Sequence, residues 1–175
     1  MLEIDEKAIS EKAIRGDDEA FLALMQLHKE ALLRTAIAFL KNEADALEAL
    51  QEITYRAYKN IHTVREPAYV KTWMIRIMMN YCQDQLKIGK RFIITGEVDE
   101  TIGKKDVYQL ELAEALATLK PDEQQLIYLK YFQEVKIREI AELSSIPEGT
   151  VKSRLHKILR SLRSHFGDKG GMNHV

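Results

Sequence analysis

Near the carboxyl end of this chain of 175 residues, basic and hydroxyl side chains recur at helical spacing between residues 150 and 160. An arginine can form paired hydrogen bonds with guanine, a serine or threonine can bond to bases or backbone, and a lysine pairs with phosphate. These residue types indicate contact with DNA rather than a reaction at a catalytic centre. The candidate DNA-contacting residues are Thr150, Lys152, Ser153, Arg154, His156, Lys157 and Arg160.

A helix with one apolar side must position these residues. Apolar residues between 151 and 162 form such a stripe, and at about 100° per residue Ser153 and Arg160 lie nearly opposite it. A shorter apolar pattern spans residues 137–143, and the polar break that follows it contains Pro147, which favours a helix start. The pattern predicts a helix-turn-helix, whose second helix has one face in a core and the other free to enter a DNA major groove.

The composition predicts an all-α protein of two small domains. Hydrophobic residues make up 46% of the chain, and only three prolines and eight glycines interrupt it. Helical periodicity is lost over residues 88–107, which we interpret as a flexible linker. The expected domains are residues 1–87 and residues 108–175, and the second contains the helix-turn-helix.

Capping and breaking residues divide the first domain into helices. Asp17 and its acidic neighbours suit the start of a first helix, because carboxylates are favoured at the positive end of the helix dipole. A break at Asn42 precedes a second helix, expected over about residues 45–61. Pro67 fits the first turn of a third helix, expected to reach residue 86.

Several residues of the third helix have both a structural and a functional interpretation. Trp73 is either a core residue or a wedge that stacks on DNA, and we expect it in the core because tryptophan usually buries as an anchor. We interpret Met74, Met78 and Met79 as adaptable core filler. Cys82 is the only cysteine, and we expect it to be a buried structural thiol.

Charge alternates along the chain, although the net charge is only −1. Residues 56–95 carry +6 and residues 131–175 carry +3, whereas the other two parts, 1–55 and 96–130, are acidic. Two basic modules separated by acidic surface suit two contacts with DNA and protein contacts elsewhere. Either basic block alone is equally consistent with an ordinary charged helix face.

The sequence argues against enzymatic, metal-dependent and membrane functions. Its glycines lack the spacing of phosphate-cradling loops, and its five histidines show no zinc-like pairing with carboxylates. No signal-peptide pattern begins the chain, and no apolar run approaches the roughly 18 residues of a membrane span. We therefore expect a soluble, cytoplasmic protein with no catalytic residue, no metal and no cofactor.

The segment PEGTVKSRLH at residues 147–156 resembles the start of the promoter-reading helix of bacterial sigma factors, and more narrowly of their extracytoplasmic-function group. The resemblance implies that this helix reads the −35 promoter element. Arg154 would then contact guanine, whereas Lys157 and Arg160 would pair with phosphates. The family usually has glycine where Ser145 stands in the turn, and we expect the turn to persist with serine at modest strain.

The segment DALEALQE at residues 45–52 resembles the sigma-factor helix that docks on the clamp of core RNA polymerase. Ala49 stands where leucine is common in the family, and Thr54 stands where an aromatic residue is common. The polar residues are suited to a basic partner surface, but they are equally consistent with a solvated helix face. The resemblance assigns core-polymerase binding to Asp45, Glu48, Leu50, Gln51 and Glu52.

The segment KTWMIRIMMN at residues 71–80 resembles the W-L-x-R-I-x-x-N signature of the same family. In that family this helix and the loop before it, residues 61–67 here, recognise the −10 element and capture a base flipped from the non-template strand. A polar, mobile loop beside a basic helix suits this task, because pocket and phosphate contacts must offset the free energy of flipping. The resemblance assigns −10 recognition to His62, Thr63, Val64, Arg65, Lys71, Arg76 and Asn80.

Together the three segments imply a sigma factor that binds core RNA polymerase, reads the −35 and −10 elements and helps to open the duplex. The resemblance further implies a stress-responsive factor that is controlled by an anti-sigma factor. An ordinary helix-turn-helix regulator with a helical effector or dimerisation domain would explain residues 108–165 equally well. It would leave the two amino-terminal segments as coincidences. A helical scaffold without a DNA function would leave the basic helix face unexplained.

Overall fold

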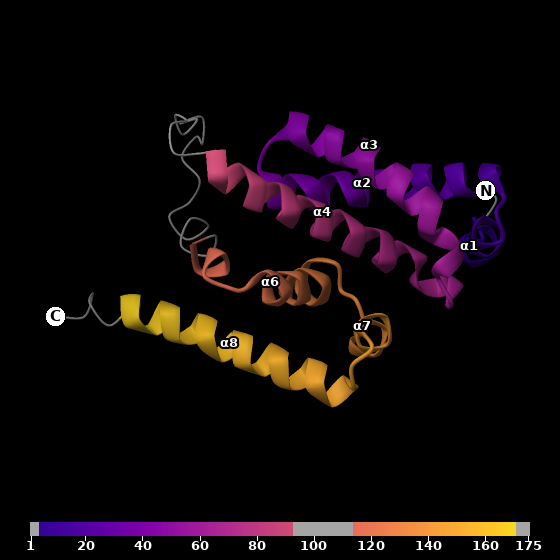
Figure 1. The fold of residues 1–175 in the computed structure, drawn as a ribbon. Coiled ribbons are helices and arrows are strands. Elements are labelled where there is room, and N and C mark those ends of the chain that lie inside the picture. Colours follow the sequence, from indigo (N-terminus) through magenta and orange to yellow (C-terminus); the bar gives the residue numbers. More distant parts are fainter. Residues whose placement is uncertain (1–3, 93–113, 171–175) are drawn as a thin grey trace. The chain divides into compact units, whose positions relative to one another are not determined.

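The computed structural model describes residues 4–92 and 114–170, which belong to two compact units divided near residue 95 (Figure 1). Every regular element among the described residues is helical, which confirms the predicted all-α fold of two domains. Within these ranges, no helix is both long and apolar enough to cross a membrane.

The first unit is built from α-helices joined by tight turns and short 3-10 segments. Its elements are α1 (Glu6–Ile14), α2 (Asp18–Leu40), α3 (Glu43–Asn60), η1 (Ile61–Thr63), η2 (Pro67–Tyr69) and α4 (Val70–Phe92). The long helices α2, α3 and α4 pack against one another, and α1 packs against α2, η1 and η2. The three expected helices are present, and α1 is a further helix that the sequence did not predict.

The boundary between α4 and the predicted linker differs from expectation. The helix continues through residues 88–92, which the sequence predicts as part of the linker. The remainder of the predicted linker, residues 93–107, lies outside the described residues.

Side-chain caps determine where the helices of the first unit begin. The Asp17 carboxylate accepts a hydrogen bond from the Ala20 amide at 3.0 Å, and the Asn42 side chain accepts one from the Asp45 amide at 2.9 Å. Each cap satisfies a backbone N–H that has no partner within its helix, which typically contributes about 1 kcal/mol. Asp17 is therefore a helix cap as predicted, and Asn42 marks the predicted break.

The core of the first unit consists mainly of aliphatic and methionine side chains. Those with at most 1% exposure include Leu24, Leu32, Ile53, Val70, Met74, Ile75, Met78, Met79 and Cys82. The prediction that the three methionines fill the core is confirmed. Burial raises the pKa of the Cys82 thiol to about 12, in agreement with a structural role. Trp73 is only half-buried, so the expectation of a core residue holds in part.

The second unit contains the predicted helix-turn-helix. After a helical turn at residues 114–117, its elements are α6 (Pro121–Ile127), the π-helical turn η3 (Tyr128–Phe132), α7 (Ile137–Ser144) and α8 (Glu148–Gly170). Both α6 and α7 pack against α8. Val151, Leu155 and Ile158 on α8 are at most 5% exposed, so the predicted apolar stripe is the face that joins this core.

A buried histidine connects α1 to α2. His28 is 4% exposed, and its Nε2 lies 3.0 Å from Oε1 of Glu6 without the alignment of a hydrogen bond. Burial lowers the pKa of His28 below its ordinary value of 6.5; the Glu6 carboxylate opposes this shift, and the positive charge of Lys71 adds to it. The imidazole of His28 is therefore neutral at pH 7.

We expect the first unit to lose stability as the pH falls below 6.5, because the unfolded chain then binds a proton at His28 that the folded chain excludes. Above that pH, the contribution of neutral His28 to the stability of the first unit is fully present. Substitution His28→Gln should flatten the pH dependence of the unfolding free energy between about pH 7.5 and 5.5. Urea titrations followed by Trp73 fluorescence measure the unfolding free energy at each pH, because Trp73 is the only tryptophan. If the unfolding free energy of the variant depends on pH as steeply as that of the wild type, His28 is not the group that excludes a proton in the folded chain.

Candidate nucleic-acid interface

The turn between α7 and α8 is closed by backbone hydrogen bonds. Ser145 adopts the left-handed conformation with φ 55° and ψ 41°. The amide of Ile146 donates to the carbonyl oxygen of Ala141 at 3.1 Å, and the amide of Thr150 donates to the carbonyl oxygen of Pro147 at 3.0 Å. The turn therefore persists with serine in the position where glycine is favoured, as predicted.

One side of α8 carries an exposed row of polar and basic residues. The exposed members of the predicted set are Lys152, Ser153, Arg154, His156, Lys157 and Arg160. Thr150 is half-buried in the first turn of the helix, so its hydroxyl is less accessible than the helical spacing suggested. We call the exposed residues the α8 basic face.

Two local hydrogen bonds order the α8 basic face. The Ser153 hydroxyl donates to the carbonyl oxygen of Gly149 at 2.8 Å. Arg160 Nη2 lies 3.1 Å from His156 Nε2, and because a guanidinium only donates, the imidazole nitrogen accepts. Five residues of the face line a shallow, open depression: Lys152, Ser153, His156, Lys157 and Arg160. A depression lined by two lysines and an arginine suits the oxygen atoms of phosphates and base edges.

The predicted polymerase-docking residues lie along α3. Asp45, Glu48 and Gln51 are exposed, whereas Leu50 and Glu52 are half-buried. The opposite side of α3 is buried and includes Ala49, the residue that departs from the family pattern. Asp45, Glu48, Gln51 and Glu52 share the solvent side of the helix, and we call these four residues the α3 acidic row; Leu50 lies beside the buried side.

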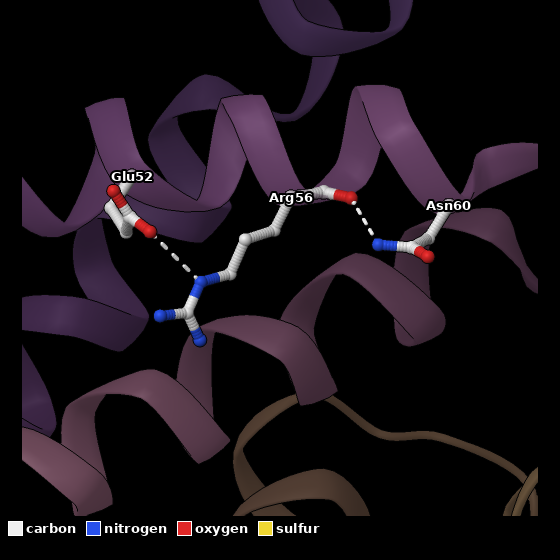
Figure 2. A network of polar contacts seen from close by, with 3 residues as sticks. All are labelled: Glu52, Arg56 and Asn60. Atoms are coloured by element: carbon white, nitrogen blue, oxygen red, sulfur yellow. Dashed lines mark hydrogen bonds and ion pairs between the residues drawn. The ribbon is translucent and has the colours of Figure 1, made fainter.

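A network centred on Arg56 extends the α3 acidic row toward α4 (Figure 2). Arg56 Nε lies 3.0 Å from Oε1 of Glu52, and the Asn60 amide donates to the carbonyl oxygen of Arg56 at 2.8 Å. The Arg56 guanidinium carbon lies 5.0 Å from the ring centre of Tyr81. Burial raises the pKa of Tyr81, and the carboxylates of Glu48 and Glu52 raise it further. Sequence reasoning did not identify Tyr81, because only the packing of α4 against α3 brings it to Arg56.

The loop predicted to meet the −10 element is structured by 3-10 turns rather than extended. His62, Thr63 and Arg65 are exposed, and the Thr63 hydroxyl donates to the carbonyl oxygen of Asn60 at 2.7 Å. Val64 is 8% exposed, so its side chain anchors the loop instead of facing a ligand as expected. Burial of an apolar side chain explains this, since exposing Val64 would forfeit hydrophobic free energy.

The three predicted −10 residues of α4 do not form one cluster. Arg76 and Asn80 are one turn apart on the same side of the helix, whereas helical geometry directs Lys71 to the other side. Lys71 and Asn80 are exposed, and Arg76 is half-buried, which lowers the pKa of its guanidinium. Lys71 lies close enough to His28 to affect its pKa.

Two family models match the chain. The model for Sigma-70 region 2 matches residues 24–92, and the model for Sigma-70, region 4 matches residues 109–162. The chain is 35% identical to the RNA polymerase sigma factor SigV of Bacillus subtilis (strain 168) over 142 residues, which cover 78% of this chain and 84% of SigV. It is 31% identical to the ECF RNA polymerase sigma factor SigW of the same organism over 173 residues, which cover 88% of this chain and 92% of SigW.

A solved structure shows the same fold. The sigma factor RpoE of Bartonella quintana, in complex with the anti-sigma factor NepR, matches with a TM-score of 0.60 and 20% sequence identity. The match covers 84% of this chain and 96% of RpoE.

Substitution Ser145→Gly should stabilise the helix-turn-helix by about 0.5–1 kcal/mol, because glycine adopts a positive φ without a Cβ penalty. The neighbouring Ser144→Gly is the matched control and should destabilise slightly, because Ser144 is the last residue of α7 and glycine has a low helix propensity. Hydrogen exchange of the α7 and α8 amides measures both changes. Shifts of the same sign in the two variants would contradict the role assigned to the turn.

Proposed function

The chain belongs to the extracytoplasmic-function sigma factors of RNA polymerase, and we propose that it directs core polymerase to specific promoters by reading their −35 and −10 elements. The observation that carries this proposal is the pairing of two surfaces on one chain. The first unit presents the α3 acidic row, and the second unit presents the α8 basic face. An ordinary helix-turn-helix regulator needs only the second surface.

Core polymerase is proposed to bind the α3 acidic row. Exposed carboxylates and an amide on a rigid helix suit a basic partner surface, because complementary charge steers association and orients the complex. The Arg56–Glu52 contact holds the Glu52 carboxylate in place beside Glu48.

The −35 element is proposed to bind the α8 basic face. Arg154 is exposed near the start of α8, where a recognition helix meets base edges, and its guanidinium can pair with guanine. Lys152, Lys157 and Arg160 are suited to phosphates, which determine register without reading sequence.

The −10 element is proposed to bind the loop at residues 61–67 together with α4. Exposed His62, Thr63 and Arg65 offer hydrogen-bonding groups to a base that leaves the stack. Lys71 and Arg76 supply positive charge for the phosphates of the opened strand. Polymerase then performs the nucleotide chemistry, and this chain acts as an initiation factor in the cytoplasm.

Control by an anti-sigma factor and a response to stress complete the proposal. Both rest on the family resemblance, and the RpoE structure, solved with its anti-sigma factor NepR, supports the first.

Substitution Glu48→Lys should weaken binding to core polymerase by about 10- to 100-fold, because a positive charge then faces a basic partner. Glu30→Lys is the matched control, since Glu30 is exposed on α2 outside the row. Co-purification with core polymerase and run-off transcription on a promoter library measure the effect. Wild-type protein that binds duplex DNA alone and supports no polymerase-dependent initiation would identify a regulator instead.

Substitution Arg154→Ala should cost ~1–3 kcal/mol on the preferred promoter and relax specificity at one base pair. Lys157→Ala should instead weaken all sequences uniformly and reduce the salt dependence of log K by about 0.9. Binding of the holoenzyme to a promoter library at several salt concentrations distinguishes the effects of the two substitutions. Uniform loss for Arg154→Ala would place that residue among the phosphate contacts.

A further inference from the structure

Helix α1 has no role in the function argued so far, because the region 2 family model begins at residue 24, within α2. We infer that α1 is a positioning element, which holds the segment from η1 to η2 in the shape that meets the −10 element. The inference rests on the proposed function of that segment.

The packing of α1 supports this role. Helix α1 contacts α2 and both 3-10 turns, which lie roughly fifty residues further along the chain. Its inward side chains, Ser10 and Ala13, are 0% and 1% exposed. Small side chains one turn apart let the backbone of α1 approach its neighbours closely. A displacement of α1 therefore removes the support behind η1 and η2.

A polar contact between α1 and α2 lies close to the same site. Glu6 on α1 lies 3.0 Å from buried His28 on α2, and the charge of Lys71 at the start of α4 acts on the same imidazole. Lys71 is the second residue of α4, which follows η2 directly, and it is one of the residues proposed to bind −10 phosphates. Glu6 and Lys71 are thus the charged groups near His28, so the place where α1 meets α2 lies close to the start of α4.

A purely stabilising role for α1 predicts a different outcome from a positioning role. If α1 only adds buried surface, its disruption lowers the stability of the first unit and affects every activity of that unit equally. If α1 positions the loop, its disruption weakens capture of the opened −10 strand while polymerase docking through α3 is retained.

The test is Ala13→Leu, which overpacks the buried face of α1, with Lys12→Leu as the control that adds the same side chain at an exposed position of the same helix. The full-length variants are assembled with core polymerase. Three affinities are measured: for core polymerase, for duplex −35 DNA, and for a single-stranded −10 oligonucleotide from a promoter selected by run-off transcription. We expect Ala13→Leu to lose about tenfold in −10 strand affinity, with the other two affinities within about twofold of wild type. Lys12→Leu should match wild type throughout.

Glu6→Gln is the second variant, and it keeps the inference testable if Ala13→Leu does not fold. Glu6 is about half exposed, so its neutralisation leaves the core intact, and we expect a loss of about threefold confined to the −10 strand. Equal losses in all three affinities, or no loss in folded Ala13→Leu, would overturn the inference alone. A wild-type holoenzyme that does not prefer the −10 strand to a scrambled strand would overturn the proposed function and the inference with it.

Discussion

Close packing of α3 through small side chains determines which surface of the first unit faces a partner. Ala46, Ala49, Ile53 and Ala57 are all 0% exposed and recur every three or four residues along one side of the helix. Rotation of α3 about its axis would expose these apolar side chains and bury carboxylates without partners. Both changes would raise the free energy of the folded state. The acidic row therefore faces outward by necessity. The apolar stripe of α8 orients its basic face in the same way.

Periodicity and capping are sufficient to predict α2, α3, α4 and the helix-turn-helix, because the signals for these elements are local. Helix α1 escapes such a prediction, since its buried Ser10 and Ala13 are too small to produce an apolar period. The burial of Val64 and the contact of Arg56 with Tyr81 depend on segments distant in sequence. The sequence therefore predicts which side of each helix is exposed at the candidate site. It does not predict the contacts that order the site, because these join segments distant in sequence.

Some polar side chains at both surfaces already have internal partners in the free protein. Arg160 is hydrogen-bonded to His156, and Arg56 contacts Glu52 (Figure 2). Binding a partner therefore exchanges one hydrogen bond for another, so the net gain per contact is modest. In return, side chains that are held before binding lose less rotamer entropy when the complex forms. Selectivity then depends on how well the partner matches an existing arrangement.

The buried thiol of Cys82 has a practical consequence. With its pKa raised to about 12 by burial, the thiol stays protonated at pH 7, whereas the thiolate is the form that attacks peroxides and maleimides. The chain is thus poorly suited to sense oxidants directly. It is well suited to spectroscopy, since a cysteine introduced at a solvent-facing position would react alone, and a dye placed there could follow strand separation with the native sulfur left in place.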